Sequence, residues 1–436
     1  MTIFNANNTD LILGEYEEFD TISISEHKFA LSQDERRRHI YAIGQTGTGK
    51  TTLLENLVLQ DIYAGRGVTL IDPHGDIAHR IANSIPRHRL NDTVYFDAAD
   101  RDHPIGFNPL SGVDSTHREL VASGIVAGFK GLWANSWGEW LEYLLKNSIM
   151  AILEYPAPGL SLAALPRFLQ DTPFRNHVLK YVRDPEVRRF WENFFGELDQ
   201  RQELERVSST LNKAGKLTLS PTLRNILGQQ RPGIDFKRVM DNNQILIINL
   251  SKGLLGADNS NLLGSLLVSH IVHLTMQRAA IPEEARIDHH LYIDEFQNFT
   301  TREFESILSE ARKYRLCLTV AHQYLDQIDP VILKAVTGNV GTLAMFSLAA
   351  ADALALEAEI APVDATRLMS SKRGSFWVRY RKDGEHQEPR QIRGFPPVSD
   401  LDRNSLKRVI NNARTRFATS RAKVEKQLAA WYANHK

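Results

Sequence analysis

The chain has 436 residues, of which 42% are hydrophobic and 24% are charged. This composition is typical of a folded globular protein and excludes a wholly disordered chain, while the length predicts two or three domains. The 52 basic and 52 acidic residues give a formal net charge of zero, so overall charge favours neither an acidic nor a basic partner. A single cysteine, Cys317, excludes an intramolecular disulfide framework and a cysteine-based metal site.

Strand and helix patterns alternate in the early part of the chain. Residues 1–38 contain short alternating stretches that predict a small N-terminal β element. After it, the pattern predicts strands at 39–43, 67–72 and 93–96, with helices at 52–64 and 77–85 between them. Such alternation predicts a parallel sheet covered by helices on both faces.

The alternation stops at about residue 115 and resumes at about residue 244. Residues 115–227 show helical periodicity with almost no strand pattern, which predicts an inserted helical domain. The α/β pattern then returns, with strands expected at 244–250, 290–294, 317–321 and 341–346, helices at 261–278 and 301–314, and a hairpin after 375. The last thirty or so residues predict a basic amphipathic helix.

A glycine-rich loop lies between the first predicted strand and helix of this alternating pattern. It matches the pattern G-x(4)-G-K-[ST], and its residues are Gly44, Gln45, Thr46, Gly47, Thr48, Gly49, Lys50 and Thr51, followed by Thr52. Glycines let successive backbone N–H groups turn toward an anion, and the helix N-terminus adds its dipole. We expect Lys50 to reach the β- and γ-phosphates and Thr51 to bind Mg²⁺. The loop therefore predicts a site for ATP and Mg²⁺.

Two adjacent carboxylates, Asp294 and Glu295, follow a later apolar strand. In proteins with such a loop, the first acid holds the Mg²⁺ shell and the second orients or deprotonates the attacking water. Asp72 ends a neighbouring strand at the same edge of the predicted sheet, where open α/β folds bind ligands. Its position fits two alternatives, an additional acid beside the site or a cap for the following turn.

Two further residues are candidates for catalysis. Gln323 follows the strand at 317–321 and would lie beside the γ-phosphate if that strand neighbours the strand of Asp294; otherwise it is an exposed loop glutamine. Arg312 lies on the helix after the acid pair. In a monomer it is an ordinary solvated charge, whereas in a ring it would reach the neighbour's γ-phosphate as an arginine finger.

Several motifs together resemble one family. They lie at 39–51, 71–76, 106–110, 293–299, 310–313, 321–323 and 338–342. In these motifs the chain resembles the HerA–FtsK superfamily of DNA-pumping ATPases, and within it is most similar to the TraG/TraD-type coupling proteins of type IV secretion and conjugation. The resemblance implies a homo-hexameric ring with nucleotides between subunits and DNA in the central channel. It also implies Arg312 as the finger acting on the neighbouring subunit and Gln323 as the sensor of the γ-phosphate.

The expected fold class is α/β, a RecA-like parallel-sheet nucleotide-binding domain with an inserted all-α domain and a short N-terminal β element. The expected division is an N-terminal β element at 1–38, the RecA-like domain at 39–113 and 228–400, the all-α domain at 114–227 and a basic C-terminal helix at 401–436. The residues predict ATP hydrolysis catalysed by Lys50, Glu295, Arg312 and Gln323. The resemblance predicts an ATP-driven DNA translocase for conjugative or mobile-element DNA transfer. The alternatives are a soluble HerA-type helicase or DNA-processing ATPase and a secretion-system ATPase that moves protein.

Partners and location are predicted less directly. Basic residues around Phe376, Trp377 and Tyr380 suit sequence-independent DNA binding, with phosphate contacts and base stacking. The alternative is a solvated hairpin whose aromatic side chains pack on the core. The resemblance adds a relaxase or type IV secretion components as partners. No apolar run reaches the roughly 18 residues of a membrane span, so we expect a cytoplasmic protein, held at the inner membrane, if at all, through partners.

Overall fold

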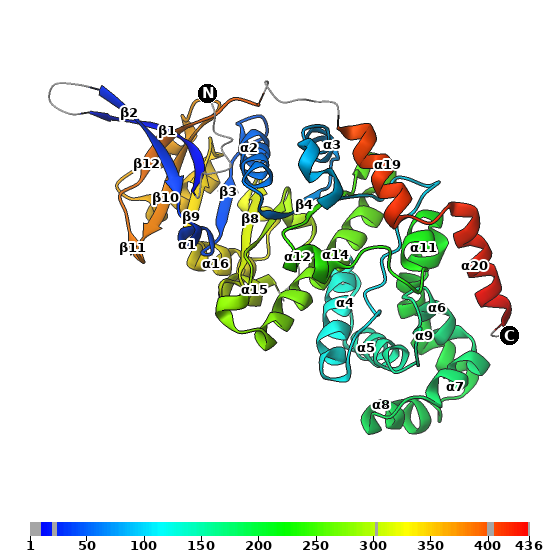
Figure 1. The fold of residues 1–436 in the computed structure, drawn as a ribbon. Helices are drawn as coiled ribbons and strands as arrows, with labels where there is room; N and C mark the ends of the chain where they lie inside the picture. Colours follow the sequence, from blue (N-terminus) through cyan, green and yellow to red (C-terminus); the bar gives the residue numbers. More distant parts are fainter. Residues whose placement is uncertain (1–9, 20–23, 301–303, 399–404, 435–436) are drawn as a thin grey trace. The chain divides into compact units, whose positions relative to one another are not determined.

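One mixed sheet forms the centre of the first of two structural units (Figure 1). The computed structural model describes residues 10–19, 24–300, 304–398 and 405–434. The first unit comprises residues up to 96 together with 236–249 and 274–412, and the second comprises 97–235, 250–273 and 413–436. Parts of the predicted N-terminal β element (1–9 and 20–23), of the helix expected at 301–314 (301–303) and of the basic C-terminal helix (401–404 and 435–436) lie outside the described residues.

The strands of the first unit follow the order β2-β1-β12-β10-β9-β3-β8-β7-β4-β6-β5, with β11 paired to β10. Their bounds are β1 Leu11–Phe19, β2 Ile24–Leu31, β3 Ile40–Ile43, β4 Gly67–Asp72, β5 Thr93–Asp97, β6 Ile245–Asn249, β7 His289–Ile293, β8 Leu316–His322, β9 Thr342–Met345, β10 Ser375–Lys382, β11 Glu385–His386 and β12 Arg390–Gly394. Strands β9, β3, β8, β7, β4 and β6 pair in parallel. Every residue of these six strands is buried, as expected for a parallel sheet covered on both faces.

The remaining strands extend this sheet in antiparallel pairs. β10 pairs with β9 and with β12, and β12 pairs with β1. The N-terminal β element is thus the edge of the main sheet, and the expected hairpin after residue 375 joins it to the parallel strands. The first half of β10 alternates as expected for such a strand, because Phe376 and Val378 are fully buried while Ser375 and Trp377 are partly exposed.

The helices of the first unit are short except for the one after the glycine-rich loop. They are α1 Gln33–Arg36, α2 Lys50–Tyr63, α3 Asp76–Asn83, α12 Phe236–Asp241, α15 Phe304–Glu310, α16 Pro330–Asn339, α17 Ala350–Leu356 and α18 Ala365–Met369. Helix α2 is buried along most of its length. The expected α/β fold class, with a mostly parallel sheet and helices, is confirmed.

The second unit is built mainly from helices. They are α4 Arg118–Leu132, α5 Glu139–Leu153, α6 Ala164–Gln170, α7 Thr172–Leu179, α8 Pro185–Arg189, α9 Gln200–Ala214, α10 Lys216–Leu219, α11 Pro221–Leu227, α13 Lys252–Leu255 and α20 Arg421–Asn434. Two more helices, α14 Ala257–Gln277 and α19 Leu406–Phe417, have residues in both units. No helix within the described residues is long and apolar enough to cross a membrane.

The predicted single C-terminal helix is wrong, because the chain forms α19 and α20 with a break between them. Ala418 pairs with Ile105 in an isolated β-bridge, and the backbone N–H of Thr419 donates to the carbonyl of Pro104 at 3.2 Å. These contacts pull the backbone out of helical geometry. The side chain of Ser420, the residue before α20, belongs to a type that favours a new helix start.

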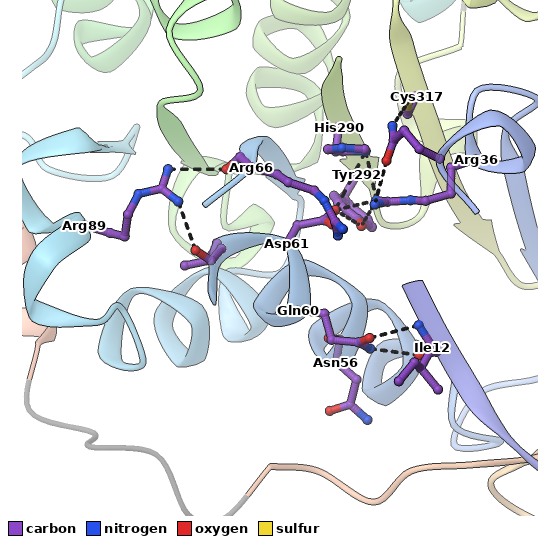
Figure 2. A network of polar contacts seen from close by, with 12 residues as sticks. Ile12, Arg36, Asn56, Gln60, Asp61, Arg66, Arg89, His290, Tyr292 and Cys317 are labelled. Carbon is purple, nitrogen blue, oxygen red and sulfur yellow. Dashed lines mark hydrogen bonds and ion pairs between the residues drawn. The ribbon is translucent and has the colours of Figure 1, made fainter. Parts of the chain in front are cut away.

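A buried polar network fixes helix α2 against the sheet (Figure 2). Asp61 of α2 is fully buried and accepts hydrogen bonds from Arg36 of α1 at 2.6 Å and from the Tyr292 hydroxyl of β7 at 2.6 Å. Gln60 of α2 bonds both the backbone N–H and the carbonyl of Ile12 in β1, at 2.9 and 2.8 Å. The helix that begins at the glycine-rich loop is therefore tied to the strand that carries the acid pair and to the edge of the sheet.

Candidate nucleotide site

The glycine-rich loop leaves the carboxyl end of β3, which lies between β9 and β8. Gly47 has φ of 78° and Gly49, which caps α2, has φ of 123°. These left-handed conformations favour glycine. A Cβ atom on Gly49 would also lie 3.2 Å from the Cα of Gly374 and 3.3 Å from the Phe346 ring. The loop is therefore closely packed on one side, and only glycine fits at its last turn.

Lys50 points back into the loop from the first turn of α2. Its side chain is 6% exposed, and its ammonium donates to the carbonyls of Gly44 and Gln45, the latter at 3.0 Å. Burial lowers the pKa of Lys50, and the nearby carboxylates of Glu295 and Asp294 partly offset that effect. The lysine charge thus lies in the same site as both acids.

The acid pair lies directly after β7, two strands from the loop. Asp294 and Glu295 are 5% and 8% exposed. Burial, the neighbouring Glu295 and the nearby Asp72 raise the pKa of Asp294 to about 7, against the weaker opposing effects of the Glu295 backbone N–H and of Lys50. Glu295 has φ of 47°, a left-handed conformation that is uncommon for a side chain of this size. Strained backbone of this kind is often found at functional sites.

Gln323 joins the loop to the acid pair. β8 does lie between β3 and β7, which is the condition that the sequence prediction required. The Gln323 amide donates to Glu295 Oε1 at 2.5 Å, and its carbonyl accepts from the Thr46 hydroxyl at 2.8 Å. Gln297 donates to the other oxygen of Glu295 at 2.6 Å. Two amides therefore hold the Glu295 carboxylate in one orientation.

Asp72 acts as a cap in this structure. It is fully buried, and its two carboxylate oxygens accept hydrogen bonds from the backbone N–H groups of His74 at 2.8 Å and Ala78 at 2.9 Å. It therefore orders the turn into α3. Its charge nevertheless contributes to the raised pKa of Asp294. Asp72 is therefore a cap for the turn and also an acid close to the acid pair.

Arg312 is not brought to the site within the chain. It lies in the turn at Ala311–Tyr314 that precedes β8, whereas Gln323 follows that strand. Its side chain is 45% exposed and forms an ion pair with Asp34 of α1 at 3.4 Å. Because Arg312 precedes β8, it lies toward the amino end of the parallel strands and away from the glycine-rich loop. A role as a finger on a second subunit stays a prediction.

A cleft of about 540 Å³ runs along the glycine-rich loop. Its lining includes residues that the sequence motifs predict, namely Thr46, Gly47, Gly49, Lys50, Thr51, Thr52, Glu295 and Gln323. It also includes residues that no motif predicts, namely Phe346, Arg373, Gly374, Phe376 and the segment Gly394–Pro397. The backbone carbonyls of Phe395 and Pro396 accept from the Asn56 amide of α2 at 3.1 and 3.2 Å, which holds that segment beside the loop helix.

The basic residues of the β10–β12 region are largely paired with acids. Arg379 is 7% exposed and bonds Glu359 and the carbonyls of Thr337 and Val340. Arg393 contacts Glu15 and Glu26, and Arg390 lies over the Tyr16 ring and contacts Glu18. Phe376 is fully buried, and Tyr380 packs edge-on against Phe29. Phe376, Tyr380 and Arg379 therefore pack on the sheet, whereas Arg393 is 60% exposed although it contacts acids. A DNA-binding role for the exposed basic side chains stays a prediction.

The glycine-rich loop, the buried lysine and the acid pair at one sheet edge define a P-loop nucleotide-binding fold. Among solved structures, the chain is similar to the bacterial conjugative coupling protein TrwBΔN70 in an unbound form, with a TM-score of 0.62 and 14% identity over 86% of this chain and 89% of that chain. TrwB in complex with ADP and Mg²⁺ matches with a TM-score of 0.58 and 13% identity over 86% and 90%.

VirB4 of Thermoanaerobacter pseudethanolicus is a further structural neighbour, with a TM-score of 0.57 and 13% identity over 89% of this chain and 97% of that chain. No protein-family model and no curated protein sequence matches the chain. The likeness therefore concerns the fold, which is that of the coupling protein TrwB and of VirB4, as the motif resemblance predicts.

Proposed function

We propose that this chain is an ATPase whose site lies along the Gly44–Thr51 loop. One observation carries the proposal. The ends of two strands, β7 and β8, and the start of helix α2 bring four side chains to that loop at one edge of the sheet, namely Asp294, Glu295, Gln323 and Lys50. TrwB, which shares the fold, has been solved with ADP and Mg²⁺ and with an ATP analogue. Those complexes support ATP and Mg²⁺ as the ligands here.

The donor set fits a magnesium nucleotide. Burial raises the pKa of Asp294 to about 7, and the neighbouring carboxylates of Glu295 and Asp72 add to that effect. A cation beside Asp294 would favour its charged form. No group of three or more His, Cys, Asp or Glu side chains among the described residues forms a metal site, and Mg²⁺ typically takes only one or two carboxylates beside phosphate oxygens. Thr51 and Asp294 would hold the ion, which neutralises phosphate charge when bound.

The remaining residues then have distinct roles. Lys50 and the loop N–H groups bind phosphate oxygens. Glu295, held by Gln323 and Gln297, orients the attacking water and accepts its proton. Gln323 bonds Thr46 as well as Glu295, so a change at the phosphates would be passed to the acid through one side chain. Arg312 of a second subunit completes the site by neutralising charge that develops on the γ-phosphate.

The motion driven by this hydrolysis is proposed to translocate DNA in a ring of identical subunits, as a coupling-protein-type motor in conjugative or mobile-element transfer. The support is the motif resemblance together with the fold of TrwB, which is a conjugative coupling protein. Binding is expected to be independent of sequence and to weaken with salt. A relaxase and type IV secretion components are the proposed protein partners.

Phosphate release from the purified protein, with and without single- and double-stranded DNA over a salt series, tests this proposal. DNA is expected to stimulate turnover at low salt. Turnover that is indifferent to both forms of DNA at every salt concentration would overturn the DNA translocase and favour an ATPase that moves protein. The absence of any turnover in the oligomer would overturn the ATPase itself.

Mixed oligomers test the role of Arg312. Subunits that carry Arg312→Ala keep an intact loop, and subunits that carry Lys50→Ala keep an intact Arg312. Each variant alone is expected to be inactive, and mixing them is expected to restore part of the activity, because some interfaces then combine an intact Lys50 with an intact Arg312. Mixtures that stay as inactive as the separate variants would show that Arg312 does not act across the interface.

A further inference from the structure

The turn Lys372–Gly374, just before β10, lies against the glycine-rich loop. The backbone N–H of Gly374 donates to the carbonyl of Thr48 at 2.8 Å, and its own carbonyl accepts from the N–H of Gly394 at 2.8 Å. Within the turn, the N–H of Ser375 donates to the carbonyl of Lys372 at 2.9 Å. Gly374 has φ of 82° and passes close to Gly49. The backbone that follows Arg373 is therefore fixed to the loop and to β12, and the Lys372 carbonyl before it closes the turn.

Arg373 lines the same cleft as the loop residues, with an exposed side chain. The charged side chains that line this cleft, within the described part of the chain, are Lys50, Glu295 and Arg373. Lys50 donates to two loop carbonyls, and the Glu295 carboxylate accepts from two amides. Neither an ion pair nor a hydrogen bond to Arg373 is found among the described residues.

Other arginines of the same region have acidic partners, unlike Arg373. Arg379 bonds Glu359, and Arg393 contacts Glu15 and Glu26. Lys372, the neighbouring residue, lines a different groove, on the side of Glu15 and Glu26. The turn thus borders two surfaces: Lys372 lines one that is rich in acids, and Arg373 and Gly374 line the cleft along the glycine-rich loop. An exposed guanidinium on a fixed backbone beside a phosphate-binding loop is suited to bidentate contact with phosphate.

We propose that Arg373 is a phosphate-binding residue of the nucleotide site and acts within the same subunit as Lys50. This inference rests on the proposed nucleotide site at Gly44–Thr51. It differs from the role proposed for Arg312, because the chain itself places Arg373 in the cleft. The turn Lys372–Gly374 then forms a second phosphate-binding element, and nucleotide binding connects the loop directly to the antiparallel half of the sheet.

Equilibrium binding of a non-hydrolysable ATP analogue and of AMP to the full chain tests this role. The wild type is compared with Arg373→Ala, Arg373→Lys and the matched control Lys372→Ala. Loss of a charged hydrogen bond to phosphate is expected to weaken binding of the ATP analogue by about tenfold to a hundredfold in Arg373→Ala. Arg373→Lys is expected to recover part of the loss, because lysine keeps the charge but not the bidentate fork. AMP binding is expected to change less than that of the analogue.

Lys372→Ala is expected to bind the analogue as the wild type does. An Arg373→Ala variant whose affinity for the analogue equals that of the wild type would overturn the inference, as would equal losses for the analogue and for AMP. The same binding measurement is made at a protein concentration at which sedimentation shows a monomer. In the monomer, Arg373 can still contribute to its own site, whereas Arg312 of a second subunit cannot. An effect seen only in the oligomer would contradict action within one subunit.

A Lys50→Ala variant distinguishes this inference from the proposed function. If Lys50→Ala loses affinity and Arg373→Ala does not, only the role of Arg373 fails. If the wild type binds no analogue, or if Lys50→Ala binds it as well as the wild type does, the nucleotide site itself fails and the inference fails with it.

Discussion

Replacing Asp61 by asparagine is predicted to destabilise the first unit strongly. Asp61 is fully buried and accepts hydrogen bonds from Arg36 at 2.6 Å, Tyr292 at 2.6 Å and Arg66 at 2.9 Å. Despite the burial, Arg36, His290 and Arg66 hold the pKa of this carboxyl well below its ordinary value. Asparagine preserves the shape of the side chain but removes the charge, so Arg36, itself 2% exposed, is left as an uncompensated buried cation.

Breaking a buried pair in this way costs about 3–5 kcal/mol. For a unit of this size, each kcal/mol lowers Tm by about 2–4 °C, so a decrease of about 6–20 °C is expected. The matched control is Asp92→Asn. Asp92 is 48% exposed and contacts Arg89 at 3.2 Å, while Arg89 keeps hydrogen bonds to three backbone carbonyls. Arg89 is itself 6% exposed, but the Asp92 carboxylate is screened by water and Arg89 keeps its backbone partners, so Asp92→Asn is expected to cost much less than Asp61→Asn.

The assay is thermal unfolding of the purified variants, with hydrogen exchange of the amides in α2 to locate the loss. Greater exchange is expected along α2 and β7, which Asp61 joins, in Asp61→Asn alone. If Asp61→Asn melts as close to the wild-type temperature as Asp92→Asn does, the Asp61 charge does not stabilise the buried Arg36. A folded-state pKa below the unfolded value also means that the Asp61 contribution is present above about pH 4 and is lost as pH falls below it.

The remaining predictions concern the nucleotide site. Glu295→Gln is expected to bind the ATP analogue with nearly the wild-type affinity and to lower kcat by about 10²–10⁴-fold, because only the proton acceptor is lost; a parallel loss of affinity, measured by titration, would contradict that role. Arg312→Ala is expected to lower kcat of the oligomer by about 10³–10⁵-fold, and turnover within twofold of the wild type would contradict a finger. Since the pKa of Asp294 is about 7, magnesium-nucleotide affinity is expected to fall as pH decreases from 8 to 6, because protonation removes the charge that binds Mg²⁺. Glu295→Gln removes one cause of the raised pKa and is expected to shift that midpoint to lower pH; binding titrations that show no pH dependence would contradict the assignment.

Local sequence context was sufficient to place the two halves of the candidate nucleotide site. The Gly44–Thr51 loop follows a strand and opens a helix, and Asp294 and Glu295 end an apolar strand, so each could be placed without knowledge of the full fold. The position of Gln323 depended on which strands are neighbours. Because β8 lies between β3 and β7, Gln323 lies between the loop and the acid pair.

Other features depend on contacts that are distant in sequence. Arg373 and Phe395 reach the cleft because β10 and β12 pair in antiparallel fashion beside β9, and no periodicity shows which strands pair. Arg36 lies in a polar run that looks exposed, yet it is buried against Asp61. The aromatic and basic residues of β10 fitted two alternatives from composition alone, and composition does not reveal that Phe376 and Arg379 are buried on the sheet.

We propose that two subunits share one ATP site in a ring around DNA. Imaging the protein with DNA and a non-hydrolysable ATP analogue tests this arrangement. We expect a closed ring with DNA in its channel, and the analogue between Lys50 of one subunit and Arg312 of the next. An analogue bound away from the Gly44–Thr51 loop, or Arg312 directed away from every bound nucleotide in an occupied ring, would contradict it.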